Sequence, residues 1–143
     1  MVDATLLERY DTNIPDNVKQ TSARIDALDS ELMAGALEQR FATEKRLEEM
    51  LLEVTAYFSF FSHLYKRWEA IQDNQEAETY MQVKARSEAT SEKFVSAAAD
   101  REASAAVKEI RYVVNYYEGE VARCEQYMNS VKRILDKERR EVA

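Results

Sequence analysis

Residues 47–71 read LEEMLLEVTAYFSFFSHLYKRWEAI and form the most regular apolar segment of the first half of the chain. The larger apolar side chains recur at alternating intervals of four and three residues, which is the spacing of a heptad repeat. A second row repeats every seven residues beside the first, and the combined face is wider than a two-stranded coiled coil needs. The segment therefore predicts a long helix that contacts more than one neighbouring helix. The first row is Leu47, Leu51, Val54, Phe58, Phe61, Tyr65 and Trp68, and the second is Met50, Tyr57, Leu64 and Ile71.

A second heptad pattern follows near the other end of the chain, where apolar residues alternate at intervals of three and four from Val107 to Leu135. Two such helices joined by a connector predict an antiparallel hairpin. One hairpin leaves part of each wide apolar face exposed to water, so we expect further copies of the chain to cover it in a homo-oligomer. The residues expected at this oligomer interface are Leu51, Phe58, Phe61, Tyr65, Trp68, Val114, Tyr117, Val121, Met128 and Leu135.

The composition also favours helices. The 143 residues include only two Gly and one Pro, although sheets with tight turns need many of both. We expect an all-α fold, elongated and folded as one domain over residues 1–143. Asp73-Asn74 is expected to end the first long helical segment, Ser87 to Ser91 to contain a break, and Asp100 to cap the last helix. The expected parts are an N-terminal arm with a short helix (1–13), a long helical segment (14–73), a connector (74–99) and a C-terminal helix (100–141).

Catalytic chemistry is sparse in this sequence. His63 is the only histidine and Cys124 the only cysteine, so neither a zinc site nor a disulfide within the chain is expected. Cys124 also falls in the apolar row, where a thiol is usually inert. We expect no enzymatic activity, no cofactor and no metal. The chain shows neither a signal-peptide pattern nor an apolar run long enough to span a bilayer, which predicts no membrane association and a reducing, cytoplasmic location.

The charge is distributed unevenly. The net charge is −7, but residues 1–78 contain 16 acidic and 8 basic residues, whereas residues 79–143 contain 11 acidic and 12 basic ones. Bases of single-stranded nucleic acid stack on aromatic rings while phosphates pair with Lys and Arg, so a local basic site in the second half is a candidate. A solvated linker explains the same residues without any function. The candidate nucleic-acid-binding residues are Lys84, Arg86, Ser87, Lys93, Arg101, Lys108, Arg111 and Tyr112.

From about Tyr80 onward the chain resembles the small phage recombination mediators of the UvsY type. The similar features are a Tyr, Lys and Ser segment, the run Val95-Ser96-Ala97-Ala98-Ala99-Asp100, the aromatic pair Tyr116-Tyr117, and Cys124. The resemblance implies a homo-oligomer that binds single-stranded DNA and helps to load a RecA-like recombinase onto strands coated by single-strand-binding protein. It also implies a location in the cytoplasm of the host cell, and it marks the segment from Lys84 to Lys93 as the stretch that contacts DNA.

Two hypotheses of different classes follow. The first is an oligomeric recombination mediator whose modest charge per chain becomes a continuous cationic surface when several copies assemble. The second is a helical structural or adaptor protein, such as a phage assembly or scaffold component, that works through coiled-coil self-association alone. The two hypotheses differ in whether the chain binds single strands at physiological salt.

Overall fold

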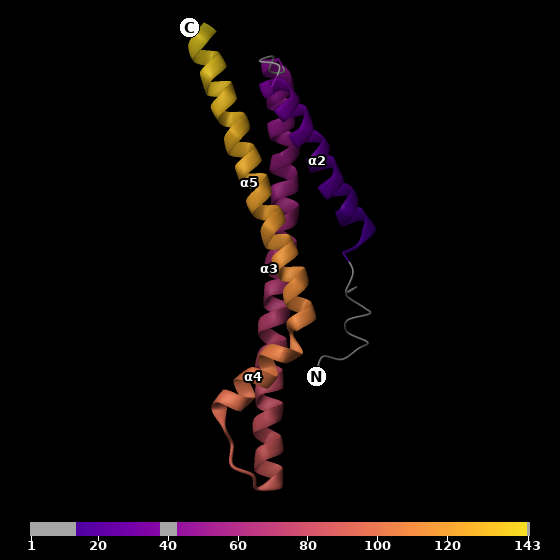
Figure 1. The fold of residues 1–143 in the computed structure, drawn as a ribbon, viewed down its shortest axis with the longest axis vertical. Coiled ribbons are helices and arrows are strands. Elements are labelled where there is room, and N and C mark those ends of the chain that lie inside the picture. The colour runs from indigo at the N-terminus through magenta and orange to yellow at the C-terminus, as the bar shows by residue number, and fades with distance from the viewer. Residues whose placement is uncertain (1–13, 38–42, 143) are drawn as a thin grey trace. The chain divides into compact units, whose positions relative to one another are not determined.

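The computed structural model describes residues 14–37 and 43–142. These residues form four α-helices and no strand (Figure 1), which confirms the predicted all-α fold. The predicted short helix within residues 1–13 lies outside the described residues. The helices are α2 (Asp16–Leu37), α3 (Glu44–Thr90), α4 (Ser96–Ala106) and α5 (Lys108–Val142).

Helix α3 extends well beyond the end that the sequence suggests. The expectation that Asp73-Asn74 ends the helix is wrong, because α3 continues without interruption to Thr90. Asp and Asn lower helix propensity by only a few tenths of a kcal/mol each, roughly, and good helix formers follow them at residues 75–78. In the absence of a Gly or Pro, the polar pair is therefore a weak stop signal.

The break expected between Ser87 and Ser91 is present, and the backbone explains it. Ser91 has a φ of 56°, the left-handed conformation that commonly ends a helix. The amide of Glu92 donates to the carbonyl of Ser87 at 3.1 Å, and the amide of Ser91 donates to the carbonyl of Glu88 at 3.4 Å. This pair of hydrogen bonds is a Schellman motif, which satisfies the last carbonyls of α3.

Asp100 does not cap the last helix, because it lies inside α4. Val95 is the N-cap of α4 and makes no side-chain capping bond. Helix α4 ends at Ala106, and the backbone turns at its C-cap, Val107 (φ −106°, ψ 11°), before α5 begins. An Asp is a good cap only where its side chain meets free amides, and at Asp100 the helix has already begun. The segment 100–141 is thus divided between α4 and α5.

The chain divides into two compact units, and α3 and α5 each contribute to both. Among the described residues, unit 1 includes residues 64–116, and unit 2 includes residues 15–37, 43–63 and 117–142. Unit 2 therefore combines segments that are distant in the sequence. Whether the chain behaves as the single domain expected from its sequence stays a prediction.

Unit 2 is a three-helix arrangement of α2, the first part of α3 and the last part of α5 (Figure 1). Arg139 pairs with Glu44 while the ring of Phe61 lies 6.3 Å from that of Tyr117, so α3 and α5 run antiparallel here, as a hairpin requires. Side-chain pairs between residues 24 and 53 and between residues 31 and 46 show that α2 is antiparallel to α3. Helix α2 therefore covers part of the wide apolar face.

The core of unit 2 draws on all three helices. Burying one aliphatic or aromatic side chain contributes about 1.5–3 kcal/mol, so the apolar residues of α2 attach it firmly to the other two helices. The hydroxyl of Tyr127 donates to the carbonyl of Leu28 at 3.3 Å and adds a buried polar link between α5 and α2. The fully buried residues of this core are Ile25, Leu28, Leu47, Met50, Val54, Phe61, Cys124 and Val131.

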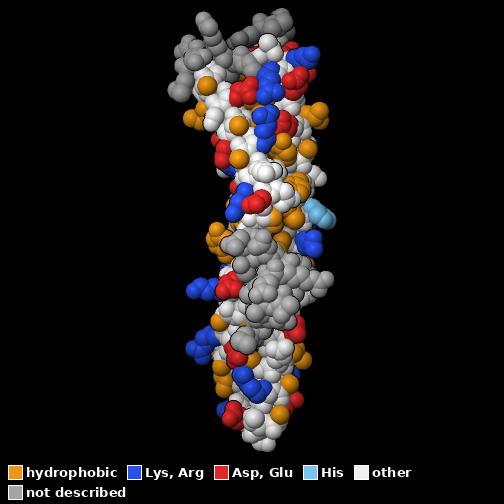
Figure 2. Space-filling view, turned by 90° about the vertical axis from the view of Figure 1, so that its right-hand side faces the viewer, with side chains coloured by type: hydrophobic (Ala, Val, Ile, Leu, Met, Phe, Trp, Pro, Cys, Tyr) orange, Lys and Arg blue, Asp and Glu red, His pale blue; other side chains and the backbone are white. Residues whose placement is uncertain are grey.

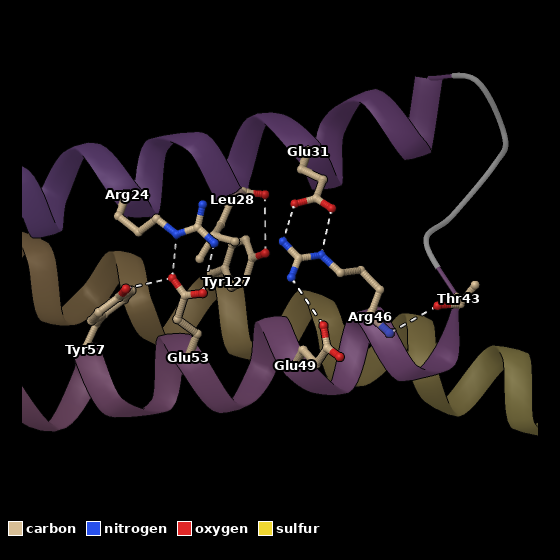
Figure 3. Close-up of polar contacts among 9 residues, drawn as sticks. All are labelled: Arg24, Leu28, Glu31, Thr43, Arg46, Glu49, Glu53, Tyr57 and Tyr127. Carbon is tan, nitrogen blue, oxygen red and sulfur yellow. Dashed lines mark hydrogen bonds and ion pairs between the residues drawn. The ribbon is translucent and has the colours of Figure 1, made fainter.

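Ion pairs on the surface fix how α2 lies against α3 (Figure 3). The Arg24 guanidinium donates to both carboxylate oxygens of Glu53, at 2.7 and 3.0 Å, and Arg46 donates to both oxygens of Glu31, at 2.9 and 2.8 Å. These hydrogen bonds lower the pKa of the Glu31 and Glu53 carboxyls. Each pair has one exposed and one half-buried partner and remains accessible to water, so the pairs set orientation and contribute little stability.

Unit 1 packs the last part of α3 against α4 and the start of α5. Alanines at positions 99 and 103 are buried, and their small side chains let α4 approach α3 closely. The ring of Tyr80 meets that of Phe94 edge to face at 5.7 Å, and Arg111 of α5 pairs with Glu76 of α3 at 3.5 Å. The other buried residues of this unit include Trp68, Thr79, Val83, Val107, Ile110, Val113 and Val114.

Two adjacent phenylalanines of α3 test the packing of the unit 2 core. We expect Phe61→Ala to lower the free energy of unfolding by about 3–5 kcal/mol, because it leaves a cavity at a fully buried position. Phe60→Ala is the matched control, since its ring is 37% exposed and its loss should cost clearly less. Urea unfolding followed by circular dichroism measures both. Equal losses for the two variants would contradict the assigned core.

Candidate nucleic-acid interface

All eight candidate nucleic-acid-binding residues belong to unit 1. They lie at the end of α3, in the connection to α4, in α4, and in the first turns of α5. The structure thus places within one compact unit a set of residues that spans 29 positions of sequence, from 84 to 112. We call the six cationic members the cationic group: Lys84, Arg86, Lys93, Arg101, Lys108 and Arg111.

The three arginines of the cationic group already have partners. Arg86 donates to Glu102 at 3.0 Å, and Arg111 donates to Ser104 at 3.0 Å and to Glu76 at 3.5 Å. The Nε of Arg101 donates to the carbonyl of Ala97 at 3.3 Å. The Arg86 pair is exposed, and such pairs contribute about 0–1 kcal/mol, so a phosphate can displace the carboxylate at low cost.

The three lysines of the cationic group are exposed, and none of them forms an ion pair with another described residue. Tyr112 is also exposed, at 63%, and it follows Lys108 by four positions, so the two lie on the same face of α5. An exposed ring beside a free ammonium provides a surface for stacking next to a contact for phosphate.

Ser87 has a structural role in addition to its place among the candidates. It is half-buried, and its carbonyl accepts the Glu92 amide and, at 3.5 Å, the Thr90 hydroxyl. These bonds end α3 and so position the connection that bears Lys93. The sequence places Ser87 both among the candidate contacts to nucleic acid and at the start of the expected break.

Acidic residues are interspersed with the cationic group. Residues 64–116 contain eight Lys and Arg against nine Asp and Glu, so the described part of unit 1 has no net positive charge. Asp73, Glu76 and Asp100 line one cavity of about 410 Å³ with Tyr80. Figure 2 shows the same mixture on the face that it presents, where basic and acidic side chains alternate and do not gather into one basic patch.

The ten residues expected at the oligomer interface divide into two sets by burial. The first set is buried within the single chain, so each of its members contributes to the fold of its own unit. The second set is half-buried and keeps part of its surface accessible. An interface role stays a prediction for all ten. The buried set is Phe61, Trp68, Val114, Tyr117 and Leu135, and the half-buried set is Leu51, Phe58, Tyr65, Val121 and Met128.

The only histidine and the only cysteine of the chain differ in accessibility. His63 is exposed, whereas Cys124 is fully buried, and burial raises the pKa of its thiol to about 11. At neutral pH this thiol is protonated and therefore a poor nucleophile. Over residues 14–37 and 43–142, no group of three or more His, Cys, Asp or Glu residues is arranged to hold a metal ion.

No helix in the described part of the chain combines the length and the apolarity that crossing a membrane requires. Comparison with known proteins found no match to the chain among family models, curated proteins or solved structures. The residues and contacts above are therefore the basis on which a function is inferred.

The raised pKa of Cys124 predicts a loss of stability in alkali. An unfolded thiol ionises near its ordinary pKa of 9.0, while the folded thiol keeps its proton to about 11. The folded state then binds more protons than the unfolded state, so the free energy of unfolding falls as pH rises from 9 to 11. Urea unfolding at pH 8 and pH 10 should show this fall, and Cys124→Ala should reduce it. An identical fall in both proteins would show that Cys124 does not contribute.

Proposed function

We propose that the chain is a non-enzymatic, homo-oligomeric protein that binds single-stranded DNA through the cationic group of unit 1. The observation that carries this proposal is the presence in unit 1 of three exposed lysines without ion pairs, one of which, Lys108, shares a face of α5 with the exposed ring of Tyr112. Lysine ammonium groups contact phosphates, and an exposed aromatic ring stacks on a base of any sequence. We therefore expect the chain to bind single-stranded DNA whatever its base sequence.

Several copies are part of the proposed mechanism. The cationic group of one chain offers few free cations and the chain has a net charge of −7, so its own affinity for a strand is expected to be low. Linked sites that engage one strand bind far more tightly than each does alone, because every contact after the first is intramolecular. An oligomer of this chain would hold a strand through many weak contacts that are individually easy to release.

The sequence resemblance to UvsY-type mediators supports a more specific role. In that role, the oligomer helps to load a RecA-like recombinase onto single strands coated by single-strand-binding protein. A set of weak, exchangeable contacts suits such a handover, since each phosphate can pass to the recombinase without a large barrier. The structural features that support the proposal are the free lysines and the exposed ion pair of Arg86.

Charge reversal tests the position of the site. Lys84→Glu, Arg86→Glu and Lys93→Glu together should weaken binding to a labelled single strand by roughly tenfold or more, because phosphate contacts dominate affinity. The control combines Lys19→Glu, Lys45→Glu and Lys66→Glu, which change the net charge equally at exposed positions elsewhere. Fluorescence anisotropy measures both. If the control loses as much affinity, or if the first variant keeps its affinity, the cationic group is not the site.

The alternative function is that of a structural or adaptor protein, and specific observations favour it as well. Arg86 and Arg111 form ion pairs within the chain, unit 1 has no net positive charge, and unit 2 has an exposed apolar groove lined by Leu51, Leu52 and Leu135. A protein that acts only by helix association needs that groove and does not need free cations.

A salt titration separates the two functions. A strand-binding protein should lose affinity steeply as salt rises from 50 to 200 mM, because cations displaced from the strand are released on binding. We expect such a fall for the wild-type protein with a strand of mixed sequence, and a flatter one for the variant reversed at Lys84, Arg86 and Lys93. Absence of binding even at 50 mM salt would favour the adaptor.

A further inference from the structure

A groove lies between α3 and α5 in unit 2, with a volume of about 320 Å³. Its apolar lining comes from Leu51 and Leu52 of α3 and from Leu135 of α5, and Thr55 adds a small polar side chain. Helix α2 contributes none of the lining residues. The groove is therefore a part of the α3 and α5 surface that the third helix of the unit leaves uncovered.

The uncovered apolar surface extends beyond the groove along the same helix faces. Phe58 follows Leu51 by seven positions, and Val121 and Met128 precede Leu135 by fourteen and seven, so each set shares one face of its helix. Phe58, Val121 and Met128 are all half-buried. A row of partly covered apolar residues on two neighbouring helices is the surface that an additional helix covers in a four-helix arrangement.

Leu52 is the most exposed of the large apolar residues described, with 74% of its surface accessible. It stands at the edge of the groove that Leu51 and Leu135 also line. A surface that has an apolar projection next to an apolar hollow is complementary to itself under a two-fold rotation, because each copy inserts its projection into the hollow of the other.

The charged residues that line the groove are also complementary to themselves under a two-fold rotation. Arg139 already pairs with Glu48 at 2.9 Å, which leaves Lys132 and Asp136 as the lining residues that form no ion pair with a described residue. They are one base and one acid on the same helix. A two-fold axis at the groove brings Lys132 of each copy toward Asp136 of the other, so both charges gain a partner in a symmetric pair.

We infer that this groove is where a second copy of the chain docks, with Leu52 of each copy in the groove of the other and with reciprocal pairing between Lys132 and Asp136. The inference extends the proposed function, which needs more than one copy to hold a strand, and it assigns the contact between copies to a named surface. It places that contact on the half-buried row and leaves the buried residues Phe61 and Tyr117 to the core of each chain.

Substitutions that place a charge in the groove test the docking surface. Leu52→Asp and Thr55→Arg should each shift the protein toward monomer at micromolar concentration, measured by light scattering after size exclusion, with unchanged helix content. Met33→Asp is the matched control, because Met33 is a 58% exposed apolar residue on α2, outside the groove. A wild-type monomer, or variants that keep the wild-type size, would overturn the inference.

A mixing experiment tests the reciprocal pair. Lys132→Glu and Asp136→Lys each place two like charges at the rim, so each variant alone should associate at least about tenfold more weakly than wild type. An equimolar mixture should restore association, since both contacts then join opposite charges. Failure of the mixture to associate better than its components would overturn the pairing.

Strand binding measured on the same samples separates this inference from the proposed function. If Leu52→Asp is monomeric while the wild-type protein binds no strand, the docking surface stands and the proposed function fails. If wild type binds strands and Leu52→Asp retains the wild-type size, the function stands and the docking surface is wrong.

Discussion

Burial of the apolar rows on α3 and α5 is the constraint on which the rest of the structure depends. In α3 the residues of the heptad row alternate in burial, because Leu47, Val54 and Phe61 are fully buried while Leu51 and Phe58 are only half-buried. One half of the row therefore faces the core of unit 2, and the other half reaches its surface. Helix α2 covers one side of this face, and the groove at Leu52 marks the side left open.

Burial of the apolar rows also determines where the charged side chains lie. Once the apolar residues are inside, Lys, Arg, Asp and Glu occupy the surface, and many of the arginines pair with carboxylates of another helix. Arg24, Arg46 and Arg139 form ion pairs between helices of unit 2, and Arg86 and Arg111 do so in unit 1. Lysines are less suited to such bidentate pairs, and those of the cationic group stay available.

Much of the fold was predictable from periodicity and composition. The scarcity of Gly and Pro and the two heptad patterns predict long helices, and these are local properties that the sequence displays directly. The continuation of α3 past Asp73-Asn74 was missed because helix-stop signals of this kind are weak. The actual end lies in the break expected between Ser87 and Ser91, and the left-handed conformation of Ser91 explains it.

The candidate site was predictable in part. The pairing of Arg111 with Glu76 joins residues 35 positions apart, and that of Arg123 with Asp26 joins residues 97 apart, so tertiary structure alone shows which cations are engaged. Leu52 was not recognised, because it falls outside both heptad rows. The doublet Leu51-Leu52 was the available signal, since a second large apolar residue beside a row lies on a different face of the helix.

The central claim of the proposed function is that the cationic group of one chain is too small to bind a strand, and that several copies acting together do so. Sedimentation velocity of the protein with a labelled single strand counts the chains in each complex directly. The account predicts that the smallest complex containing a strand holds at least two chains. A stable complex of one chain with one strand, with affinity equal to that of the larger assembly, would contradict it.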